Sequence, residues 1–355
     1  MDNLLDLPRA EAEQRLARSM HEAGEPEYRA RQVADRLWRN PAPTFGDMTE
    51  LPVSLRERLT STFSIPRLQL DTRQASRDGT EKFLFRLDDG EGIETVAIPE
   101  QNRLTLCISS QAGCALQCAF CATGAMGFAR NLRPFEIAGQ VREMILLGLK
   151  PTNIVFMGMG EPLMNWKAVD VALSLLNDPG ALGVGARHIT VSTVGVLPGI
   201  QALAARPEQF RLALSIHAPT DALRQQLMPI NTKYPLSQVI EAAKTFVRRV
   251  TFEYVLLGDI NDSVAQAEQL AALARQCGAF VNLIPLHPGG ALGFTPSSSK
   301  ATSTFMGTLR KRGVETALRK SRGVDISAAC GQLRVERLGR RSPRGAEQNR
   351  DVHVA

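Results

Sequence analysis

Six short apolar segments alternate with helix-length amphipathic segments, and this alternation constrains the fold more than any other feature of the sequence. The apolar segments are residues 104–109, 153–157, 188–192, 211–216, 251–256 and 280–285. Strands separated by helices in this way pair in parallel, and the helices cover the sheet. A closed barrel of this kind has eight such units, so six units predict an α/β fold built on a partial, open (β/α)6 barrel.

The chain before and after this core has a different texture. Residues 1–65 contain helical patterns over 4–23, 26–38 and 51–63, separated by prolines, and predict a small N-terminal helical domain. Residues 66–99 have strand patterns around the turn 88–90 and predict a β-hairpin extension. The core then covers residues 100–333. Residues 334–355 contain six Arg together with Gly, Ser and Pro and little to bury, and they predict a flexible basic tail.

The charge of the chain is unevenly distributed. The 42 Lys and Arg residues exceed the 36 Asp and Glu residues by six, and residues 301–355 alone hold 12 basic against 5 acidic residues. If the protein binds a polyanion, the C-terminal end therefore indicates it better than the total charge. No apolar run reaches the roughly 20 residues that span a bilayer, and the N-terminus lacks the basic start of a signal peptide. We expect a cytoplasmic protein without a membrane partner.

Polar residues follow several of the predicted strands. Gly160 and Glu161, Ser192 with Thr193, Ser215 with His217, and His287 all fall at strand ends. Parallel barrels carry their chemistry at the carboxyl ends of the strands. These residues are therefore candidates for one functional site.

Three of the six cysteines, Cys114, Cys118 and Cys121, lie at spacings of four and three residues just after the first core strand. Six cysteines are too few for a disulfide scaffold, so the cluster indicates metal binding or thiol chemistry. Three thiolates so close together can bind three irons of a cubane cluster and leave the fourth iron open for catalysis. A zinc site is the alternative, but it needs a fourth ligand that the spacing does not supply.

The cysteine loop, with Phe120 before the last cysteine, resembles the cluster loop of the radical S-adenosylmethionine superfamily. The turn 158–162, Gly-Met-Gly-Glu-Pro, is similar to the motif that holds the amino group of the cofactor in that superfamily. The resemblance implies a [4Fe-4S] cluster whose open iron chelates S-adenosylmethionine, and a 5′-deoxyadenosyl radical released by reductive cleavage. It also implies a low-potential electron donor such as flavodoxin.

The resemblance narrows to the adenine methyltransferases that modify carbon 2 of adenosine in 23S rRNA and tRNA, and it runs from about Glu27 to Leu333. The matching stretches are residues 27–32, 78–80, 93–96, 121–124, 215–219, 228–231 and 328–333. The implied substrates are 23S rRNA at the peptidyl-transferase centre and tRNA next to the anticodon.

Carbon 2 of adenine is electron-poor and cannot attack the methyl group of the cofactor directly. In the resembled family, a cysteine is methylated by one cofactor molecule, and a second cofactor activates that methyl group, so that two are used per turnover. The carbon radical adds to the base, and a second cysteine then resolves the thioether through a transient disulfide. The resemblance makes Cys330 the methyl carrier, Cys107 the resolving thiol and Glu94 the proton acceptor.

These roles have structural alternatives. Cys107 lies in an apolar strand, where a cysteine is usually only packed, and Glu94 lies between apolar neighbours as a solvated strand charge would. For the cofactor, the resemblance implicates Gly160, Glu161, Ser192 and residues 215–217, which are Ser215, Ile216 and His217. His287 is a departure, because many relatives have Asn at this position. It retains a hydrogen-bonding ring, which predicts a cofactor contact, and the alternative is a satisfied strand-end histidine without a functional role.

RNA binding rests on weaker signals. Aromatic residues make up only 5% of the chain, so phosphate contacts and shape are expected to dominate over base stacking. The helix with Arg29, Arg31, Arg36 and Arg39 is a candidate RNA surface, or equally a solvated helix face. The target base must be unpaired or flipped to reach the barrel mouth.

Three other functions remain open from the sequence. One is methylation of carbon 8 of the same rRNA adenosine, which related enzymes perform with the same cysteines. Another is a non-methylating radical enzyme, such as a glycyl-radical activase. The last is a redox-sensing RNA-binding protein with a regulatory cluster. The sequence leaves the electron donor and the oligomeric state undecided.

Overall fold

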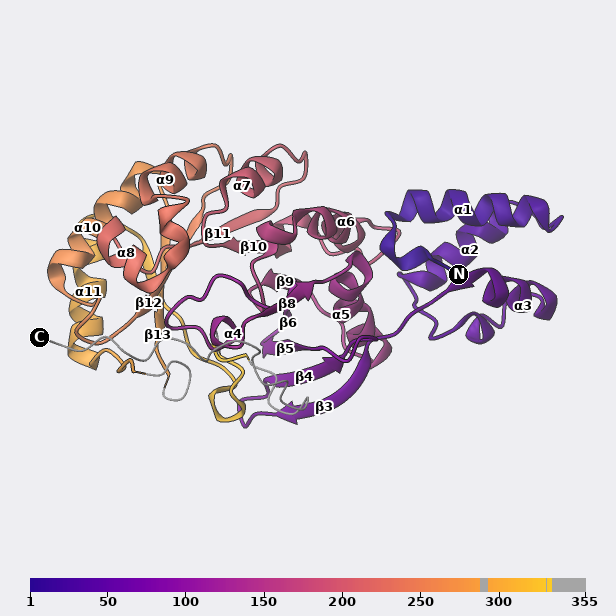
Figure 1. The fold of residues 1–355 in the computed structure, drawn as a ribbon, viewed down its shortest axis with the longest axis horizontal. Helices are drawn as coiled ribbons and strands as arrows, with labels where there is room; N and C mark the ends of the chain where they lie inside the picture. The colour runs from indigo at the N-terminus through magenta and orange to yellow at the C-terminus, as the bar shows by residue number, and fades with distance from the viewer. Residues whose placement is uncertain (288–292, 330, 334–355) are drawn as a thin grey trace, which may run out of the picture.

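The computed structural model describes residues 1–287, 293–329 and 331–333. Within them the molecule is elongated, with three N-terminal helices at one end and a sheet wrapped by helices at the other (Figure 1). Among the described residues no helix is long and apolar enough to cross a membrane.

The N-terminal part is helical, as the sequence predicts. Its helices are α1 (Arg9–Glu22), α2 (Tyr28–Leu37) and α3 (Val53–Thr62), with short 3-10 helices η1 (Leu4–Asp6) and η2 (Phe45–Asp47). The two-residue strands β1 (Asp2–Asn3) and β2 (Phe63–Ser64) pair in parallel and bring both ends of this part together. The helix predicted over residues 4–23 begins only at Arg9. Pro8 occupies its N-cap, where the fixed φ and missing N–H of proline are tolerated.

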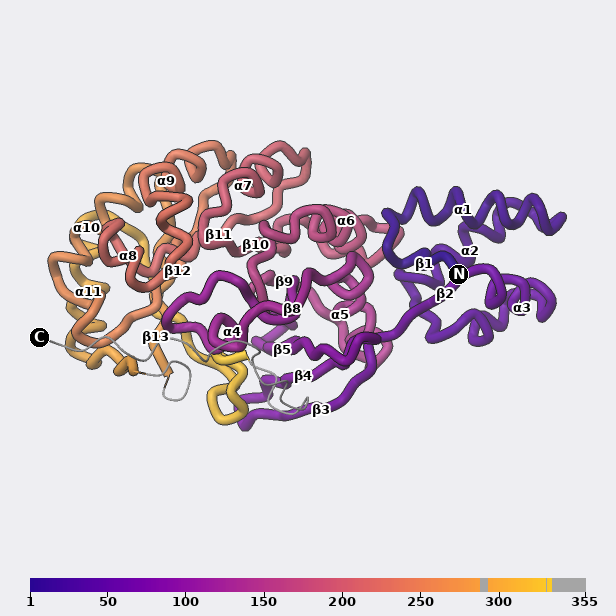
Figure 2. Tube along the Cα trace, viewed as in Figure 1, coloured from indigo at the N-terminus to yellow at the C-terminus, as the bar shows by residue number. Residues whose placement is uncertain are grey.

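The core of the described chain is one ten-stranded sheet in the order β14-β13-β12-β11-β10-β9-β6-β5-β4-β3. Its parallel strands are β6 (Arg103–Cys107), β9 (Asn153–Phe156), β10 (Ile189–Thr193), β11 (Arg211–Ser215), β12 (Thr251–Leu256), β13 (Phe280–Pro285) and β14 (Thr316–Leu318). Strands β3 and β14 form the two edges, so the sheet is open (Figure 2). The predicted partial barrel is confirmed. Its six expected strands are joined by a seventh, β14, which has only three residues and gives no sequence signal.

The expected hairpin is part of a larger antiparallel extension of the same sheet. Strands β3 (Gln69–Ala75), β4 (Glu81–Arg86) and β5 (Gly92–Glu100) pair in sequence, and β5 then pairs with β6. The β4–β5 turn falls where the sequence predicts it, closed by a hydrogen bond of 2.9 Å from the Gly90 amide to the Leu87 carbonyl. The extension therefore continues the barrel wall.

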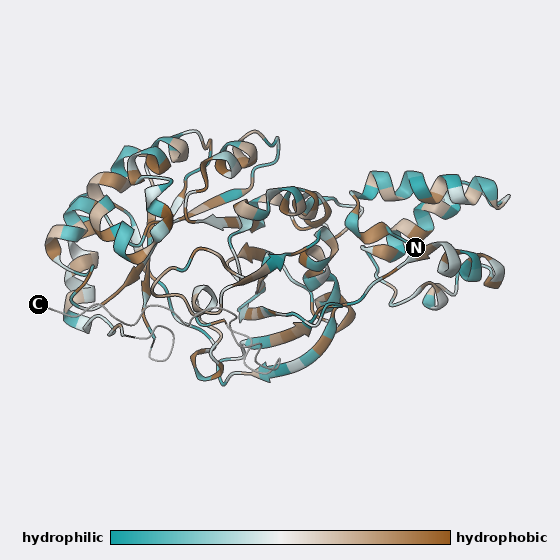
Figure 3. Ribbon diagram, viewed as in Figure 1, coloured by the Kyte–Doolittle hydropathy of each residue, from teal (hydrophilic) through white to brown (hydrophobic). Residues whose placement is uncertain are grey.

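Helices cover the outside of the parallel strands, with apolar faces turned inward and polar faces outward (Figure 3). Helix α6, for example, buries Val169, Leu173 and Leu176 at helical spacing. The covering helices are α5 (Pro134–Leu146), α6 (Trp166–Asn177), α7 (Leu197–Ala204), α8 (Asp221–Leu227), α9 (Leu236–Lys244), α10 (Val264–Gln276) and α11 (Ser299–Lys311). The remaining short helices are α4 (Ala122–Ala125), η3 (Pro162–Asn165), η4 (Ala186–His188), η5 (Pro229–Thr232) and η6 (Val324–Ile326).

A buried arginine joins the N-terminal helices to the core. Arg142 of α5 is 1% exposed, and its guanidinium donates to the carbonyls of Leu37 at 2.8 Å and Ala42 at 2.5 Å. Burial lowers the pKa of Arg142 to about 10, which leaves it charged at neutral pH. Charged donors make the stronger hydrogen bonds, so this contact fixes the α2 end against α5.

We predict that Arg142→Leu lowers the free energy of unfolding by about 2–3 kcal/mol, because two buried carbonyls lose a charged donor. Urea denaturation followed by tryptophan fluorescence measures it, since Trp38 is buried next to Leu37. The control is Arg58→Leu, on the half-exposed surface of α3, where a change within about 0.5 kcal/mol is expected. Equal losses in both variants contradict the prediction.

Candidate active site

The three clustered cysteines lie on a loop that leaves and rejoins a small two-stranded sheet. Strand β7 (Gln111–Gly113) precedes the loop and β8 (Phe128–Asn131) follows it. The amide of Cys114 donates to the carbonyl of Gly127 at 2.8 Å and closes the base of the loop. Gly113 has a φ of +75°, and a Cβ there would lie 2.0 Å from the Gly127 oxygen. Only glycine permits this closure.

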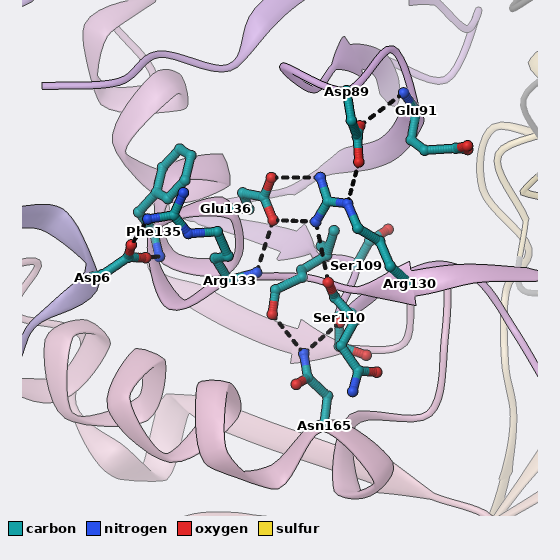
Figure 4. A network of polar contacts seen from close by, with 12 residues as sticks. Asp6, Asp89, Glu91, Ser109, Ser110, Arg130, Arg133, Phe135, Glu136 and Asn165 are labelled. Carbon is teal, nitrogen blue, oxygen red and sulfur yellow. Dashed lines mark hydrogen bonds and ion pairs between the residues drawn. The ribbon is translucent and has the colours of Figure 1, made fainter. Parts of the chain in front are cut away.

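A charged network holds the base of the cysteine loop (Figure 4). Arg130 of β8 makes two hydrogen bonds to the Glu136 carboxylate, at 2.7 and 2.8 Å, and also contacts Asp89 in the β4–β5 turn. Glu136 in turn accepts from the Arg133 amide at 2.7 Å. Two hydrogen bonds from one guanidinium fix orientation as well as distance. The loop is therefore braced against both α5 and the antiparallel extension.

The cysteine loop also meets α8, where the Ala119 amide donates to the Leu227 carbonyl at 2.9 Å and Arg224 is buried. This side chain donates to Asn231 at 2.8 Å and to the carbonyl of Val194, at the end of β10. Burial lowers the pKa of Arg224 to about 10, with Cys118 acting in the other direction. The guanidinium is thus charged at neutral pH and lies beside Cys118. A fixed positive charge here stabilises negative charge on the cysteine loop.

The chemistry of the three thiols fits a bound cationic cluster. Burial raises the pKa of Cys114 to about 11 and also raises that of Cys118, with Cys121 adding to both. Such thiols ionise only when metal cations compensate the charge. Three such thiols on one short loop fit a cluster in which each thiolate binds a different iron.

The strand-end residues predicted from the sequence meet at one pocket, which we call the central pocket. Cys114, Cys118 and Cys121 line it together with Gly160, Glu161, Ser192, Ser215, His217 and His287. The sequence predicts that these side chains share one site, and in the structure they line one pocket. Ile216 does not line the pocket: it is fully buried, and its amide donates to the Glu253 carbonyl at 3.0 Å. Its contribution there is to the packing and the backbone.

The glycine turn after β9 is packed against the cysteine side of the pocket. Gly160 has a φ of +93°, and a Cβ there would lie 2.4 Å from the Gln111 side chain. The carboxylate of Glu161 accepts from the amides of Leu163 at 3.0 Å and Val194 at 2.9 Å. Burial raises the pKa of Glu161 to about 7. The Glu161 carboxylate therefore links the segments that follow β9 and β10. The absence of a side chain at Gly160 leaves room for the side chain of Gln111.

His217 is held as a neutral ring. Its Nδ1 accepts from the amide of Val255 at 3.0 Å, and its ring meets Phe120 of the cysteine loop edge-on, with centroids 4.6 Å apart. Burial lowers the pKa of His217 to about 3. The ring thus supports the loop and faces the pocket as an uncharged group.

His287 lies where the central pocket meets a second pocket, and it lines both. Its Nε2 is hydrogen-bonded to the hydroxyl of Ser321. Burial lowers the pKa of His287. The His287 ring is therefore tied to the segment after β14.

Sequence reasoning missed a buried acid in the barrel. Glu253 of β12 lines the central pocket, is 5% exposed and accepts from Asn282 at 2.8 Å. Burial raises the pKa of Glu253, while Arg319 acts to lower it. Strand register aligns Ser215, Glu253 and Asn282 on neighbouring strands. A single acid inside the apolar segment 251–256 was the available signal.

Glu94 is not the solvated strand charge of the structural alternative. It is 3% exposed, and its carboxylate lies 3.0 Å from the ammonium of Lys82, which is also buried. Its backbone carbonyl accepts from the Ser109 hydroxyl at 2.6 Å. A buried carboxylate stays charged only beside a cation, so Lys82 keeps Glu94 able to accept a proton.

Cys107 is buried, as a structural cysteine would be, but it also lines the second pocket, which we call the side pocket. It lies opposite Val96 in the β5–β6 pairing, two residues along β5 from Glu94. The side pocket and the central pocket share Met157, His287, Arg319 and Leu333. Cys107 and the cysteine loop thus face adjoining spaces.

Cys330 lies outside the described residues, but both of its neighbouring segments are described and anchored. Before it, the Gly323 amide donates to Asp78 at 2.9 Å and the carbonyl of Ser327 lies 3.4 Å from the Lys82 ammonium. After it, the Gly331 carbonyl accepts from Ala122 at 2.8 Å, and that of Leu333 accepts from the Thr123 hydroxyl at 2.7 Å. The described segment before position 330 is thus held by the antiparallel extension, and the described residues after it are held by the cysteine loop.

A partial barrel with a three-cysteine loop at the mouth of its pocket defines a radical S-adenosylmethionine enzyme, and residues 108–273 match the family model of the Radical SAM superfamily. Residues 2–65 match the model of the ribosomal RNA large subunit methyltransferase N-terminal domain. Enzymes of this superfamily use S-adenosylmethionine and an iron–sulfur cluster.

The chain belongs to the RlmN family of dual-specificity RNA methyltransferases. It is 67% identical to a probable dual-specificity RNA methyltransferase RlmN of Gemmatimonas aurantiaca, over 100% of this chain and 99% of that protein. It is 45% identical to the corresponding enzyme of Anaeromyxobacter dehalogenans, over 94% of this chain and 93% of that one. The crystal structure of a radical SAM methyltransferase from Sphaerobacter thermophilus covers 94% of this chain and 99% of its own, with a TM-score of 0.88 and 45% identity.

We predict that His217 makes the cofactor-free protein less stable as the pH falls. The folded-state pKa lies far below the ordinary 6.5, so only the unfolded chain takes up the proton between these values. Stability is then lost as the pH falls below about 6.5, by nearly 1.4 kcal/mol per pH unit. Urea denaturation at pH 7 and pH 5 should show a smaller loss for His217→Gln. The exposed His21→Gln variant should behave like the wild type, and parallel curves for all three proteins contradict the prediction.

Proposed function

We propose that this enzyme methylates carbon 2 of adenosine in 23S rRNA, at the peptidyl-transferase centre, and in tRNA next to the anticodon. The relatives' names state dual specificity for RNA. The observation that supports the proposal is that the segment before position 330 contacts Lys82, the partner of Glu94, and that the residues after it contact the cysteine loop. It is the arrangement expected if a methyl group is carried on Cys330, activated at the cluster side and released at the Glu94 side.

Each proposed role follows from the local environment. When bound, the cluster and S-adenosylmethionine supply the methyl group and the hydrogen-abstracting radical, with two cofactor molecules used per turnover. Cys330 carries the methyl group as a thioether. Glu94, kept charged by Lys82, accepts the proton that leaves adenine carbon 2. The radical adduct would also give up one electron, which the cluster could accept when bound. The Cys107 thiolate then attacks the Cys330 sulfur, the sulfur–carbon bond breaks as the disulfide forms, and the methylene group left on carbon 2 takes up a proton to become the methyl group.

Cofactor contacts are proposed for Gly160, Glu161, Ser192 and Ser215, with Ile216, His217 and His287. All except Ile216 line the central pocket. The Glu161 carboxylate and the His217 Nδ1 already have backbone partners, so we assign their contribution to shape and backbone donors. His287 is hydrogen-bonded to Ser321, and a cofactor contact there competes with that bond.

We further propose the domain division 1–65, 66–99, 100–333 and 334–355, with residues 1–65 as an accessory RNA-binding domain. The arginines of α2 give it limited support. Arg36 lies 3.2 Å from Glu50, and Arg29 donates to the Glu50 carbonyl at 3.2 Å. Arg31 and Arg39 are exposed and are the better candidates for RNA contact. Both substrate RNAs occur in the cytoplasm, where we expect the enzyme to draw on a donor such as flavodoxin.

We predict that the anaerobically reconstituted enzyme converts adenosine in unmodified 23S rRNA and tRNA fragments to 2-methyladenosine. Mass spectrometry with authentic standards separates it from 8-methyladenosine. Cys330→Ala should give no methylated RNA because the methyl carrier is absent. Cys107→Ala should accumulate a covalent RNA–protein adduct because the thioether is not resolved. Cys277→Ala, at the end of α10, is the control and should keep activity. The 8-methyl product, or full activity of Cys330→Ala, contradicts the proposal.

We also predict the effect of removing the basic tail, which lies outside the described residues. Truncation after Arg337 should weaken RNA binding and reduce its dependence on salt, because fewer counterions are released. The modified atom should not change. Binding measured at several salt concentrations, together with nucleoside analysis of the product, checks both parts. Methylation at another position by the truncated enzyme shows that the tail does more than attract RNA.

A further inference from the structure

The side pocket opens beside the cofactor site and has a strongly basic wall. Arg319, Lys320 and Arg322 line it, on the segment that follows β14, and Cys107 lies in the same pocket. None of these cations has a role in the chemistry described above. We call Lys320 and Arg322 the basic rim.

The rim carries uncompensated positive charge. Lys320 and Arg322 form no ion pair with any described residue. The acid that lines the side pocket, Glu100, is paired with Arg103 at 2.8 Å. The two acids nearest in sequence are also engaged, because Glu315 pairs with Arg249 at 2.5 Å and Asp325 accepts from the Ser76 hydroxyl at 2.5 Å. The rim is therefore available for an anion from outside the described chain.

The rim is also fixed in place. The Arg319 amide donates to the Leu283 carbonyl at 2.8 Å, which continues the β14 edge. Ser321 is hydrogen-bonded to His287, and Gly323, the residue after Arg322, is held by Asp78 in the β3–β4 turn. Residues 319–322 thus cross from one edge of the open sheet toward the other. Cations on an anchored backbone can set the register of a bound polyanion.

We propose that Lys320 and Arg322 bind the RNA phosphates on either side of the target adenosine and so place its base in the side pocket, next to Cys107. The proposal rests on the proposed function, in that it takes RNA as the substrate. Phosphate is the anion that RNA presents continuously, and flipping a base exposes the two flanking phosphates to the protein surface. Because the pockets share a wall at Arg319 and Met157, a base seated there also faces the cofactor side.

The experiment measures binding of a synthetic anticodon stem-loop by fluorescence anisotropy, using the full-length holoenzyme. Lys320→Ala/Arg322→Ala is expected to raise the Kd roughly tenfold at low salt and to reduce the slope of log K against log salt by about 1.4–1.8, which corresponds to two phosphate contacts. The matched control is Lys300→Ala/Lys311→Ala, on α11, where neither residue lines either pocket. Thermal melting shows whether the variants remain folded.

A second RNA locates the contact. Its two phosphates flanking the adenosine are replaced by neutral methylphosphonates. The wild type should bind it about tenfold more weakly, whereas the rim variant should bind both RNAs equally. A rim variant with unchanged Kd and salt slope overturns the proposal, and so does a methylphosphonate penalty that persists in the variant. Binding is read independently of product, so a wrong or absent methylated nucleoside would count against the proposed function alone.

Discussion

An open sheet has two free edges, here β14 and β3. The site of this enzyme depends on the segment after β14, which runs from the first edge to the β3–β4 turn at the other and is held there by Asp78. The Asp78 carboxylate accepts from Gly323 at 2.9 Å, across 245 residues of sequence, and from its own turn at Thr80. Burial acts to raise the pKa of Asp78, but the hydrogen bonds from Thr80, Gly323 and Ser76 lower it to about 2. The carboxylate therefore stays ionised over the whole physiological range. This contact fixes the residues before position 330, and the cysteine loop fixes those after it.

The closure also explains why the antiparallel extension belongs to the active site. Strands β4 and β5 carry Lys82 and Glu94 into the protein interior, where each charge alone would be costly. As a pair they are tolerated, and they lie where the segment before position 330 passes. The Lys82 ammonium is within 3.4 Å of the Ser327 carbonyl. The hairpin therefore not only widens the sheet but also holds the segment that precedes position 330.

Sequence reasoning recovered what depends on local pattern. All six expected core strands are present, because alternating apolar and amphipathic segments determine a parallel sheet directly. The strand-end residues meet at one pocket because parallel strands end on the same side. Strand β14, the inward-facing Glu253 and the Asp78–Gly323 contact were missed. A three-residue strand has too little pattern, one acid in an apolar segment does not show which side it faces, and the last contact joins distant residues.

The net positive charge of the C-terminal end can be read from the sequence, but the positions of the individual charges cannot. Half of the 12 basic residues in 301–355 precede residue 323, and they do not act alike. Arg312 is paired with Glu268 at 2.5 Å on the outer surface, whereas Lys320 and Arg322 line the pocket that holds Cys107. Counting charges predicts affinity for a polyanion but not its position. We therefore expect register on the RNA to depend on the folded segment after β14, and total charge to govern only how strongly RNA is attracted.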